Sequence, residues 1–387
     1  MVLNLAKEYG VDKMSRSFCA WSHVVSLLFS QLTHSIGLND VCDTLRNHSS
    51  KLLAIRGAKA PALNTLSNAN KKRNSDMAEA LFSKMLKHLT QLNPDFAGSG
   101  RYSKFPRRFT RSIYAIDSST ISLVARCMDW AKHRRKKSAA KLHLRLNLQT
   151  FLPSFAIVEE ASHHDDTRAV DLCASLQDGE IALFDKAYVN FKHLYLLTER
   201  GVYWVTRAKD NMKYKVRKRL IRKPEGNIIK DELIYLTVAN SKKQYSKSFR
   251  RVEAKVEVDG KEVIMVFITN NLDWATSTIC ELYQARWAIE VFFKQLKQTL
   301  QLSSFLGYSK NAIRWQVWTA LLLYLLLRVQ AFISSWNHSF TRLLTVIRGV
   351  LWSRFHLLGL LESYGIAGSK YRMCAAPQDA YLPGFSP

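Results

Sequence analysis

The chain of 387 residues is predicted to fold as an α/β protein with helices before and after a central sheet. Three observations predict this class. Residues 1–95 repeat apolar side chains at helical spacing, short apolar strands alternate with helices from Arg111, and helical spacing returns after residue 270. A chain of this length buries a large core, and its apolar content of 47% excludes a disordered protein.

The first part of the chain is expected to be helical. Its apolar spacing predicts helices over Trp21–Leu32, Leu38–Leu45 and Asp76–Leu92, the last one after the polar segment Asn64–Arg73. The sequence Gly98-Ser-Gly100, followed by Pro106, predicts a linker. We therefore expect a separate helical domain over residues 1–97.

The central part is expected to alternate strands with helices. Ser112–Asp117 predicts a buried strand that ends in an acid, and Ile121–Ala125 is expected to be its partner. The remaining elements expected, in order, are strands at Leu142–Leu148 and Phe155–Val158, a helix capped near Asp165 or Asp166, a strand at Glu180–Phe184 that delivers Asp185, a helix at Phe191–Arg200 and a strand at Val202–Thr206.

Residues 212–270 break this alternation and predict a β-rich insertion, with turns at Pro224–Gly226 and at Asp259-Gly260. Helices are expected again over Cys280–Lys297, Trp315–Trp336 and Leu343–Tyr364, and an irregular tail from Ala375. The most apolar stretch, Val317–Leu327, is shorter than the roughly 20 residues that span a bilayer. We expect it to be a buried core helix.

The charge of the chain indicates a polyanionic partner. There are 57 Lys and Arg against 31 Asp and Glu, a net charge of +26. The basic residues cluster in Lys132–Lys137, Arg207–Lys223 and Lys242–Arg251. Such runs also occur as solvated faces or targeting patches, but three of them with this net charge favour nucleic acid. Phosphate contacts of this kind do not read bases.

The six cysteines are dispersed and include no Cys-x-x-Cys pair. This usage predicts thiols in a reducing cytoplasm and neither a disulfide framework nor a zinc site. The first residues do not have the pattern of a signal peptide.

One stretch near the last third of the chain combines polar groups suited to a phosphate-cleaving site. Tyr283, Arg286, Glu290 and Lys297 are offset by three, seven and fourteen residues, so on one helix they share an arc of roughly 60°. The neighbouring arc is apolar and is expected to face the core: Ile289, Phe292, Phe293, Leu296 and Leu300. An amphipathic helix with a salt-bridged surface is the alternative.

Two further acids, Asp117 and Asp185, are each expected at the end of an apolar strand. Carboxylates at strand ends converge readily in α/β folds. Together with Glu290 these two acids make three carboxylates, a set that can hold two Mg²⁺ ions in a phosphodiester-cleaving site. The alternative for Asp117 is a turn residue in Asp117–Thr120. His143, His163 and His164 are candidate metal ligands beside Asp165 and Asp166, but surface histidines near a helix cap are the favoured interpretation.

The residues resemble a known family. Tyr283, Arg286, Glu290 and Lys297 fit the Y-x2-R-x3-E-x6-K signature of a branch of DDE transposases from bacterial insertion sequences, the insertion-sequence-four family. Asp117 in Ile-Asp-Ser-Ser-Thr resembles the first acid of that family, and Asp185 in Phe-Asp-Lys-Ala-Tyr resembles the second. The usual D-R-G-Y around the second acid is replaced here by Lys186 and Ala187.

The resemblance implies a ribonuclease-H-like catalytic domain over residues 108–337, a helical domain over 1–97 as a candidate for DNA binding, and a helix and tail over 338–387. It implies cut-and-paste transposition by a homodimer that binds terminal inverted repeats and target DNA, with two Mg²⁺ ions (or Mn²⁺) on Asp117, Asp185 and Glu290. Arg286, Lys297 and Tyr283 would hold the DNA end, and Trp274 would stack on a displaced base. A ribonuclease-H-like nuclease or resolvase without strand transfer, and an inactive DNA-binding repressor, are the alternatives.

Overall fold

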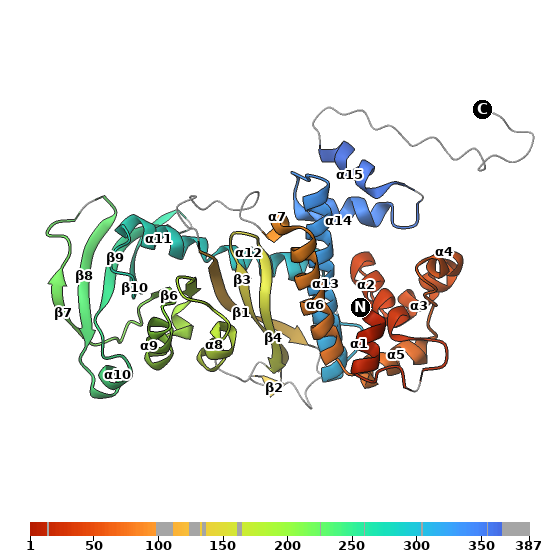
Figure 1. The fold of residues 1–387 in the computed structure, drawn as a ribbon, viewed down its shortest axis with the longest axis horizontal. Coiled ribbons are helices and arrows are strands. Elements are labelled where there is room, and N and C mark those ends of the chain that lie inside the picture. Colours follow the sequence, from red (N-terminus) through yellow and green to blue (C-terminus); the bar gives the residue numbers. More distant parts are fainter. Residues whose placement is uncertain are drawn as a thin grey trace, which may run out of the picture. The chain divides into compact units, whose positions relative to one another are not determined.

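The computed structural model describes residues 1–13, 15–97, 111–123, 132–133, 137–160, 165–224, 226–258, 260–302, 305–353 and 355–365. The chain forms two compact units: Met1–Phe96 with Gln295–Pro387, and Ala97–Lys294 (Figure 1). The expected linker at Gly98–Gly100 and the tail from Ala375 lie outside the described residues. The functional domain ranges 1–97, 108–337 and 338–387 stay predictions.

The unit Ala97–Lys294 is built on one mixed sheet. In its described part the strands are β1 (Ile113–Leu123), β2 (Lys132–His133), β3 (Lys137–Asn147), β4 (Leu152–Glu160), β5 (Ile181–Phe184), β6 (Tyr203–Arg207), β7 (Tyr214–Arg219), β8 (Ile228–Leu236), β9 (Phe249–Val258) and β10 (Lys261–Thr269). Their order is β2-β3-β1-β5-β6-β10-β9-β8-β7, with β4 on β3.

Strand β1 lies where the sheet changes from antiparallel to parallel pairing. It pairs antiparallel with β3 and parallel with β5, and β5 pairs parallel with β6. Helix α8 (Asp165–Cys173) connects β4 to β5, and α9 (Phe191–Glu199) connects β5 to β6. Apolar side chains of both helices and of the central strands form the core, including Leu172, Leu197 and Trp204. This is the ribonuclease-H-like α/β arrangement that the resemblance implied.

The expected strand at Ile121–Ala125 was wrong as a partner of the first strand. β1 runs on without a break to Leu123, and its antiparallel partner is β3. The four residues Asp117–Thr120 suggested a turn, but hydroxyl-bearing and β-branched side chains also suit a strand. Ser118, Ser119 and Thr120 pair with His143, Leu142 and Lys141. Asp117 is therefore in the middle of a strand and not at its end.

The predicted β-rich insertion is confirmed, and it extends the same sheet. β10 pairs with β6, and β9, β8 and β7 follow outward, with the short helix α10 (Ala239–Gln244) between β8 and β9. The predicted hairpin is present, since Val258 at the end of β9 pairs with Lys261 at the start of β10. Gly260 in its turn has φ +74°, a conformation that side chains other than glycine rarely adopt.

The single helix expected over Cys280–Lys297 was wrong. The structure has α11 (Thr276–Ala285), α12 (Ala288–Lys294) and a π-helical turn, η3 (Gln295–Thr299), which belongs to the other unit. Around Arg286 the backbone tightens into three-residue turns, with the amides of Arg286 and Trp287 bonded to the carbonyls of Tyr283 and Gln284. The motif is therefore not one continuous α-helix, and the uniform 100° step does not extend across it.

The other unit is helical. Its elements in the described residues are α1 (Val2–Glu8), α2 (Ala20–Thr33), α3 (Leu38–Asn47), α4 (Ser49–Ala54), α5 (Leu63–Lys72), α6 (Asp76–Leu92) and α7 (Pro94–Ala97), then α13 (Lys310–Ile333), α14 (Phe340–Gly349) and α15 (Leu357–Gly365). The polar segment Asn64–Arg73 thus lies mostly in helix α5. The single helix expected over Leu343–Tyr364 was wrong, because α14 and α15 are separate.

Helix α13 packs against α2, α5 and α6. Within the described residues it is the one helix that is long and apolar enough to cross a membrane, and 78% of its most apolar window is buried inside the protein. The expectation of a buried core helix is confirmed.

Candidate functional site

Asp117 projects from the middle of β1, and its side chain is 19% exposed. Its Oδ1 accepts a hydrogen bond of 2.7 Å from the amide of Ser118. Burial raises the pKa of Asp117 to about 6, against the opposing effects of Arg286 and the Ser118 amide, and the charges of Asp185 and Glu290 raise it further. The electrostatic influence of both other acids shows that the three predicted carboxylates belong to one neighbourhood.

Arg286 joins two of these carboxylates. It lies in the turn between α11 and α12, and its Nη1 is 2.9 Å from Oδ2 of Asp117 while its Nη2 is 3.0 Å from Oε1 of Glu290. Only 6% of the Arg286 side chain is exposed, against 59% of Glu290. Burial would lower the pKa of Arg286, but Tyr283 and the three carboxylates raise it. The guanidinium is therefore a fixed positive charge among the acids.

Tyr283 links the third acid to the same cluster. Its hydroxyl donates to Oδ1 of Asp185 at 3.4 Å, and its ring packs on Phe267 at a centroid distance of 4.8 Å. The Arg286 guanidinium lies 5.5 Å from the Tyr283 ring centroid. Burial raises the pKa of Tyr283 to about 12, so the phenol stays a hydrogen-bond donor at neutral pH. Tyr283 is thus a buried support and not part of a solvent-facing stripe.

Asp185 follows β5 directly, as predicted, and caps a short 3₁₀ helix, η2 (Lys186–Tyr188), by accepting from the amide of Ala187 at 3.3 Å. Ala187 is not among the residues with positive φ. The turn after Asp185 therefore accepts alanine without strain, so the replacement of the family's glycine does not disturb this position.

The two other predicted DNA contacts are Lys297 and Trp274. Lys297 is in η3, in the other unit, where partial burial lowers its pKa. Trp274 precedes α11 and packs against Tyr203 with ring centroids 5.2 Å apart, and its carbonyl accepts from Arg250. That packing suits a structural role for Trp274. Its expected stacking on a base stays a prediction.

The donor chemistry of the three acids suits a hard divalent cation, because all three offer carboxylate oxygens. Two of them already converge on one cation, the guanidinium of Arg286. As arranged, however, no three His, Cys, Asp or Glu side chains in the described part of the chain gather closely enough to hold a metal ion. The residue types fit a metal, and Arg286 contacts one oxygen of Asp117 and one of Glu290.

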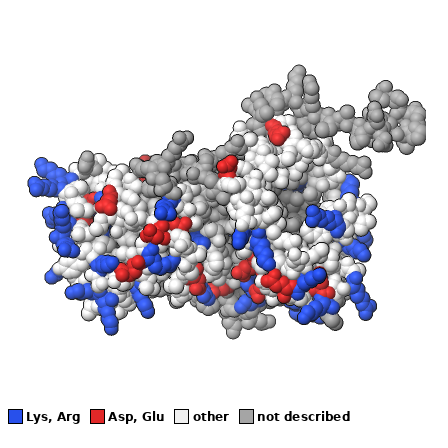
Figure 2. All heavy atoms as spheres, in the orientation of Figure 1, with Lys and Arg blue, Asp and Glu red and all other residues white. Residues whose placement is uncertain are grey.

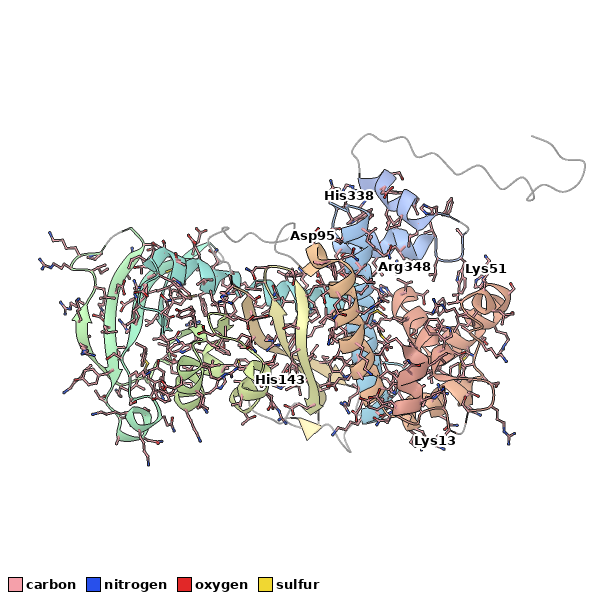
Figure 3. The ribbon with its side chains drawn as sticks, viewed as in Figure 1. Lys13, Lys51, Asp95, His143, His338 and Arg348 are labelled. Carbon is pink, nitrogen blue, oxygen red and sulfur yellow. The ribbon has the colours of Figure 1, made fainter. Side chains whose placement is uncertain are left out.

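The histidines do not extend the site in the described residues. His143 is fully buried on β3 (Figure 3), and its Nε2 lies 3.1 Å from Oε1 of Glu159, which also forms an ion pair with Arg168. This is a buried structural pair and not a surface histidine. His163 and His164 lie outside the described residues.

Trp287, which the sequence motif did not single out, follows Arg286 directly and has 37% of its surface exposed. An exposed indole beside the cluster is a natural surface for a nucleic-acid base. The sequence feature that could have identified Trp287 is its position as an aromatic residue inside the motif of a strongly basic chain.

Comparison with known proteins identifies the family of the chain. A family model described as Transposase DDE domain matches residues 108–326, and a Domain of unknown function (DUF4372) matches residues 2–56. The protein y4zB of Sinorhizobium fredii, named as a transposase, is 29% identical over 60% of this chain and 65% of its own. A Geobacillus stearothermophilus protein, named as the transposase of insertion sequence element IS5377, is 27% identical over 59% of each chain.

The chain thus spans less than two thirds of the length of these two curated relatives. A Synechocystis protein named for insertion sequence element IS4SA is 24% identical over 72% of this chain and 74% of its own. A solved piggyBac transposase synaptic complex with hairpin DNA covers 94% of this chain and 77% of its own, at 9% identity and a TM-score of 0.42, a likeness too slight to carry an argument. The family model covers more than half of the chain. The protein therefore belongs to the Transposase DDE domain family.

Proposed function

We propose that this protein is the transposase of an insertion sequence, which cleaves the DNA at the ends of its element and joins those ends to target DNA. The observation that carries the proposal is the cluster in which Arg286 bridges Asp117 and Glu290 while Tyr283 bonds to Asp185. Three acids far apart in the sequence meet around one motif. Members of this family generally use divalent metal ions.

In this proposal Asp117, Asp185 and Glu290 would hold two Mg²⁺ ions, for which Mn²⁺ can substitute. Bound ions of this kind activate the attacking oxygen and stabilise charge on the leaving oxygen of a phosphodiester. The burial of Asp117 keeps water from its carboxylate and strengthens its interaction with any cation nearby. Arg286, once released from the carboxylates, would contact backbone phosphate as a bidentate donor, and Lys297 would add a second positive charge.

The surface of the insertion supports a DNA partner. The edge strand β7 exposes the side chains of residues 215–219, and four of these five are basic: Lys215, Arg217, Lys218 and Arg219. Figure 2 shows Lys and Arg gathered over this end of the sheet, at the left of the view. Lysines on an edge strand also prevent edge-to-edge pairing, but four positive charges among five successive exposed residues fit a phosphate backbone. A homodimer acting on two paired element ends in the cytoplasm completes the proposal.

The test uses purified full-length protein and duplexes taken from the DNA on either side of its reading frame, with Mg²⁺ present. Nicked or hairpinned ends, followed by joining to a target plasmid, are expected. Asp117→Asn and Glu290→Gln should each abolish cleavage while leaving duplex binding within about twofold, because they remove a charge from the site and keep its shape.

Glu262→Gln is the matched control, because Glu262 is an exposed acid of the same unit, paired with Lys255. It should cleave like the unaltered protein. Cleavage that persists in Asp117→Asn would refute the assignment of the site. Cleavage without any joining would favour a nuclease or resolvase, and binding without cleavage would favour a repressor.

A further inference from the structure

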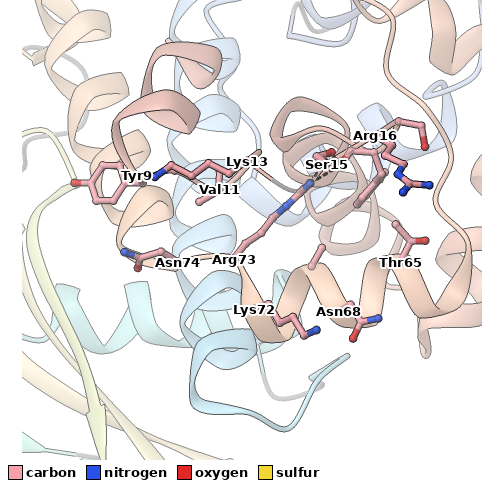
Figure 4. A pocket seen from close by; sticks show the side chains of 14 residues that line it. Tyr9, Val11, Lys13, Ser15, Arg16, Thr65, Asn68, Lys72, Arg73 and Asn74 are labelled. Carbon is pink, nitrogen blue, oxygen red and sulfur yellow. Dashed lines mark hydrogen bonds between the residues drawn. The ribbon is translucent and has the colours of Figure 1, made fainter.

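A cavity of about 560 Å³ opens on the helical unit, within residues 9–74 (Figure 4). One wall is helix α5, which contributes Thr65, Asn68 and Lys72 at offsets of three and seven residues. The opposite wall is the segment between α1 and α2, which contributes Lys13, Ser15 and Arg16. Its volume is in the range of ligand pockets, about 300–1,000 Å³.

The lining is basic and polar. Four of the lining residues are Lys or Arg, and the set includes no Asp or Glu. Lys13, Arg16 and Lys72 are exposed, and among the described residues no carboxylate lies within ion-pair distance of them. A concave surface lined by charges of one sign focuses its field and concentrates counter-ions. The cavity is therefore suited to an anion.

The fourth basic residue that lines the cavity, Arg73, connects its two walls. Its side chain crosses the space toward the opposite wall (Figure 4). There it donates to the carbonyls of Cys19 and Phe18 and forms an ion pair of 3.3 Å with Asp12. Asp12 in turn accepts from the amide of Ala20 at the start of α2. The charge of Arg73 is thus balanced by Asp12, and its side chain links the two walls of the cavity.

The C-terminal end of α5 also accepts hydrogen bonds from helix α13. The carbonyl of Arg73 accepts from the indole of Trp315 at 2.8 Å, and Asn311 donates to the carbonyl of Asn70 at 2.9 Å. Both donors lie on α13 of the same unit. The cavity therefore has fixed walls, and the exposed side chains of α5 present amide, hydroxyl and ammonium groups from a supported helix.

We infer that this cavity binds the phosphodiester backbone of duplex DNA, with Lys13, Arg16 and Lys72 on the phosphates and Thr65 and Asn68 as hydrogen-bond partners. Hydroxyl, amide and basic side chains are the groups that contact DNA phosphates and sugars. The inference rests on the proposed function in one respect, that the protein acts on DNA. It assigns a second DNA contact, far along the sequence from the catalytic acids, to the region matched by the Domain of unknown function and to α5.

The test compares two triple variants of the full-length protein by fluorescence anisotropy with a labelled 30-base-pair duplex, in EDTA and at several salt concentrations. Lys13→Ala/Arg16→Ala/Lys72→Ala removes the three cavity charges. Lys59→Ala/Lys71→Ala/Lys87→Ala removes three exposed charges of the same unit that do not line the cavity. The net charge of the two variants is identical, and thermal unfolding verifies that both fold.

The cavity variant is expected to bind about tenfold or more weakly and to lower the slope of log K against log salt by about 2 to 3, because each lost phosphate contact removes about 0.9 from that slope. The control should lose less than about threefold. Equal losses in both variants would show that only net charge matters and would overturn the inference. A mononucleotide that displaces the duplex at micromolar concentration would assign the cavity to a free nucleotide and would also overturn it.

The two proposals fail in different ways. If the unaltered protein binds no duplex DNA, the proposed function fails and the cavity assignment fails with it. If the unaltered protein binds and cleaves DNA while the cavity variant binds equally well, the cavity assignment fails alone.

Discussion

The Nη1 atom of Arg286 lies 2.9 Å from Oδ2 of Asp117, although 169 residues of chain separate the two. The second terminal nitrogen of the same guanidinium contacts Glu290. A side chain that was expected to hold phosphate thus contacts two of the acids instead. A metal ion that uses Oδ2 of Asp117 or Oε1 of Glu290 would compete with Arg286 for that oxygen.

Arg286→Gln should therefore weaken the metal-free protein and strengthen its response to metal. We expect the free energy of unfolding to fall by about 2 kcal/mol, because the charged hydrogen bond to the mostly buried Asp117 is lost. We also expect Mn²⁺ to raise the melting temperature of the variant more than that of the unaltered protein. Calorimetry with and without Mn²⁺ measures both effects.

Arg314→Gln is the control for this change, since Arg314 also bridges two carboxylates, Asp76 and Glu79, but in the helical unit. It should lose stability without gaining a metal response. An equal metal response in the two variants would contradict competition between Arg286 and metal at Asp117 and Glu290.

Tyr283 should tolerate loss of its hydroxyl better than loss of its ring. Tyr283→Phe removes the bond of 3.4 Å to Asp185 but keeps the packing on Phe267, so the free energy of unfolding should change by no more than about 1 kcal/mol. Tyr283→Ala leaves a cavity and should cost about 3 kcal/mol. Urea unfolding distinguishes the two, and similar losses would show that the hydroxyl and not the ring is the support.

Arg250 ties the insertion to the start of α11. Its Nε is 2.8 Å from Asp231, its Nη2 is 3.2 Å from Thr276, and both partners of the ion pair are nearly fully buried. Arg250→Ala leaves Asp231 buried without its partner and should cost about 3–5 kcal/mol, with loss of cleavage because α11 carries Tyr283.

The double variant Arg250→Met/Asp231→Leu should recover most of that stability, because no charge is left unpaired. Lys230→Ala, which removes an exposed partner of Glu253 on the same sheet, should change the free energy of unfolding by less than about 1 kcal/mol. If Arg250→Ala were as stable as Lys230→Ala, the role of Arg250 would be contradicted.

His23 predicts a pH dependence of folding. It is fully buried beside Asn70, with Nε2 2.8 Å from Oδ1, and burial lowers its pKa to about 3. The unfolded chain takes up a proton near pH 6.5 and the folded one does not, so stability is complete above pH 6.5 and falls as the pH drops toward 3. The contribution of this group is at most about 1.4 kcal/mol per pH unit.

Urea unfolding at pH 7, 6 and 5 should therefore show a smaller fall for His23→Gln than for the unaltered protein. His88→Gln, at an exposed position on α6, is the control and should keep the original slope. An unchanged slope in His23→Gln would place the pH dependence elsewhere.

Local patterns predicted most helices and strands, because an element that packs on one face has apolar residues at the spacing of a helix or a strand. The helix Asp76–Leu92, the strand before Asp185 and the Asp259-Gly260 hairpin were each found where spacing and turn chemistry placed them. The prediction was wrong at residues whose local sequence is compatible with two kinds of structure. Ser118–Thr120 suits a turn or a strand, and pairing with β3 decided in favour of the strand.

The amino-acid sequence by itself determined the α/β class, the basic character, and the identities and order of the residues that resemble a transposase motif. These depend on composition and on spacing along the chain. Only the tertiary structure decided that the motif helix breaks at Arg286, that Tyr283 is buried against Phe267, and that Arg286 rests on Asp117 and Glu290. Which oxygen a guanidinium reaches depends on pairing between segments distant in the sequence, and helical periodicity carries no information about that pairing.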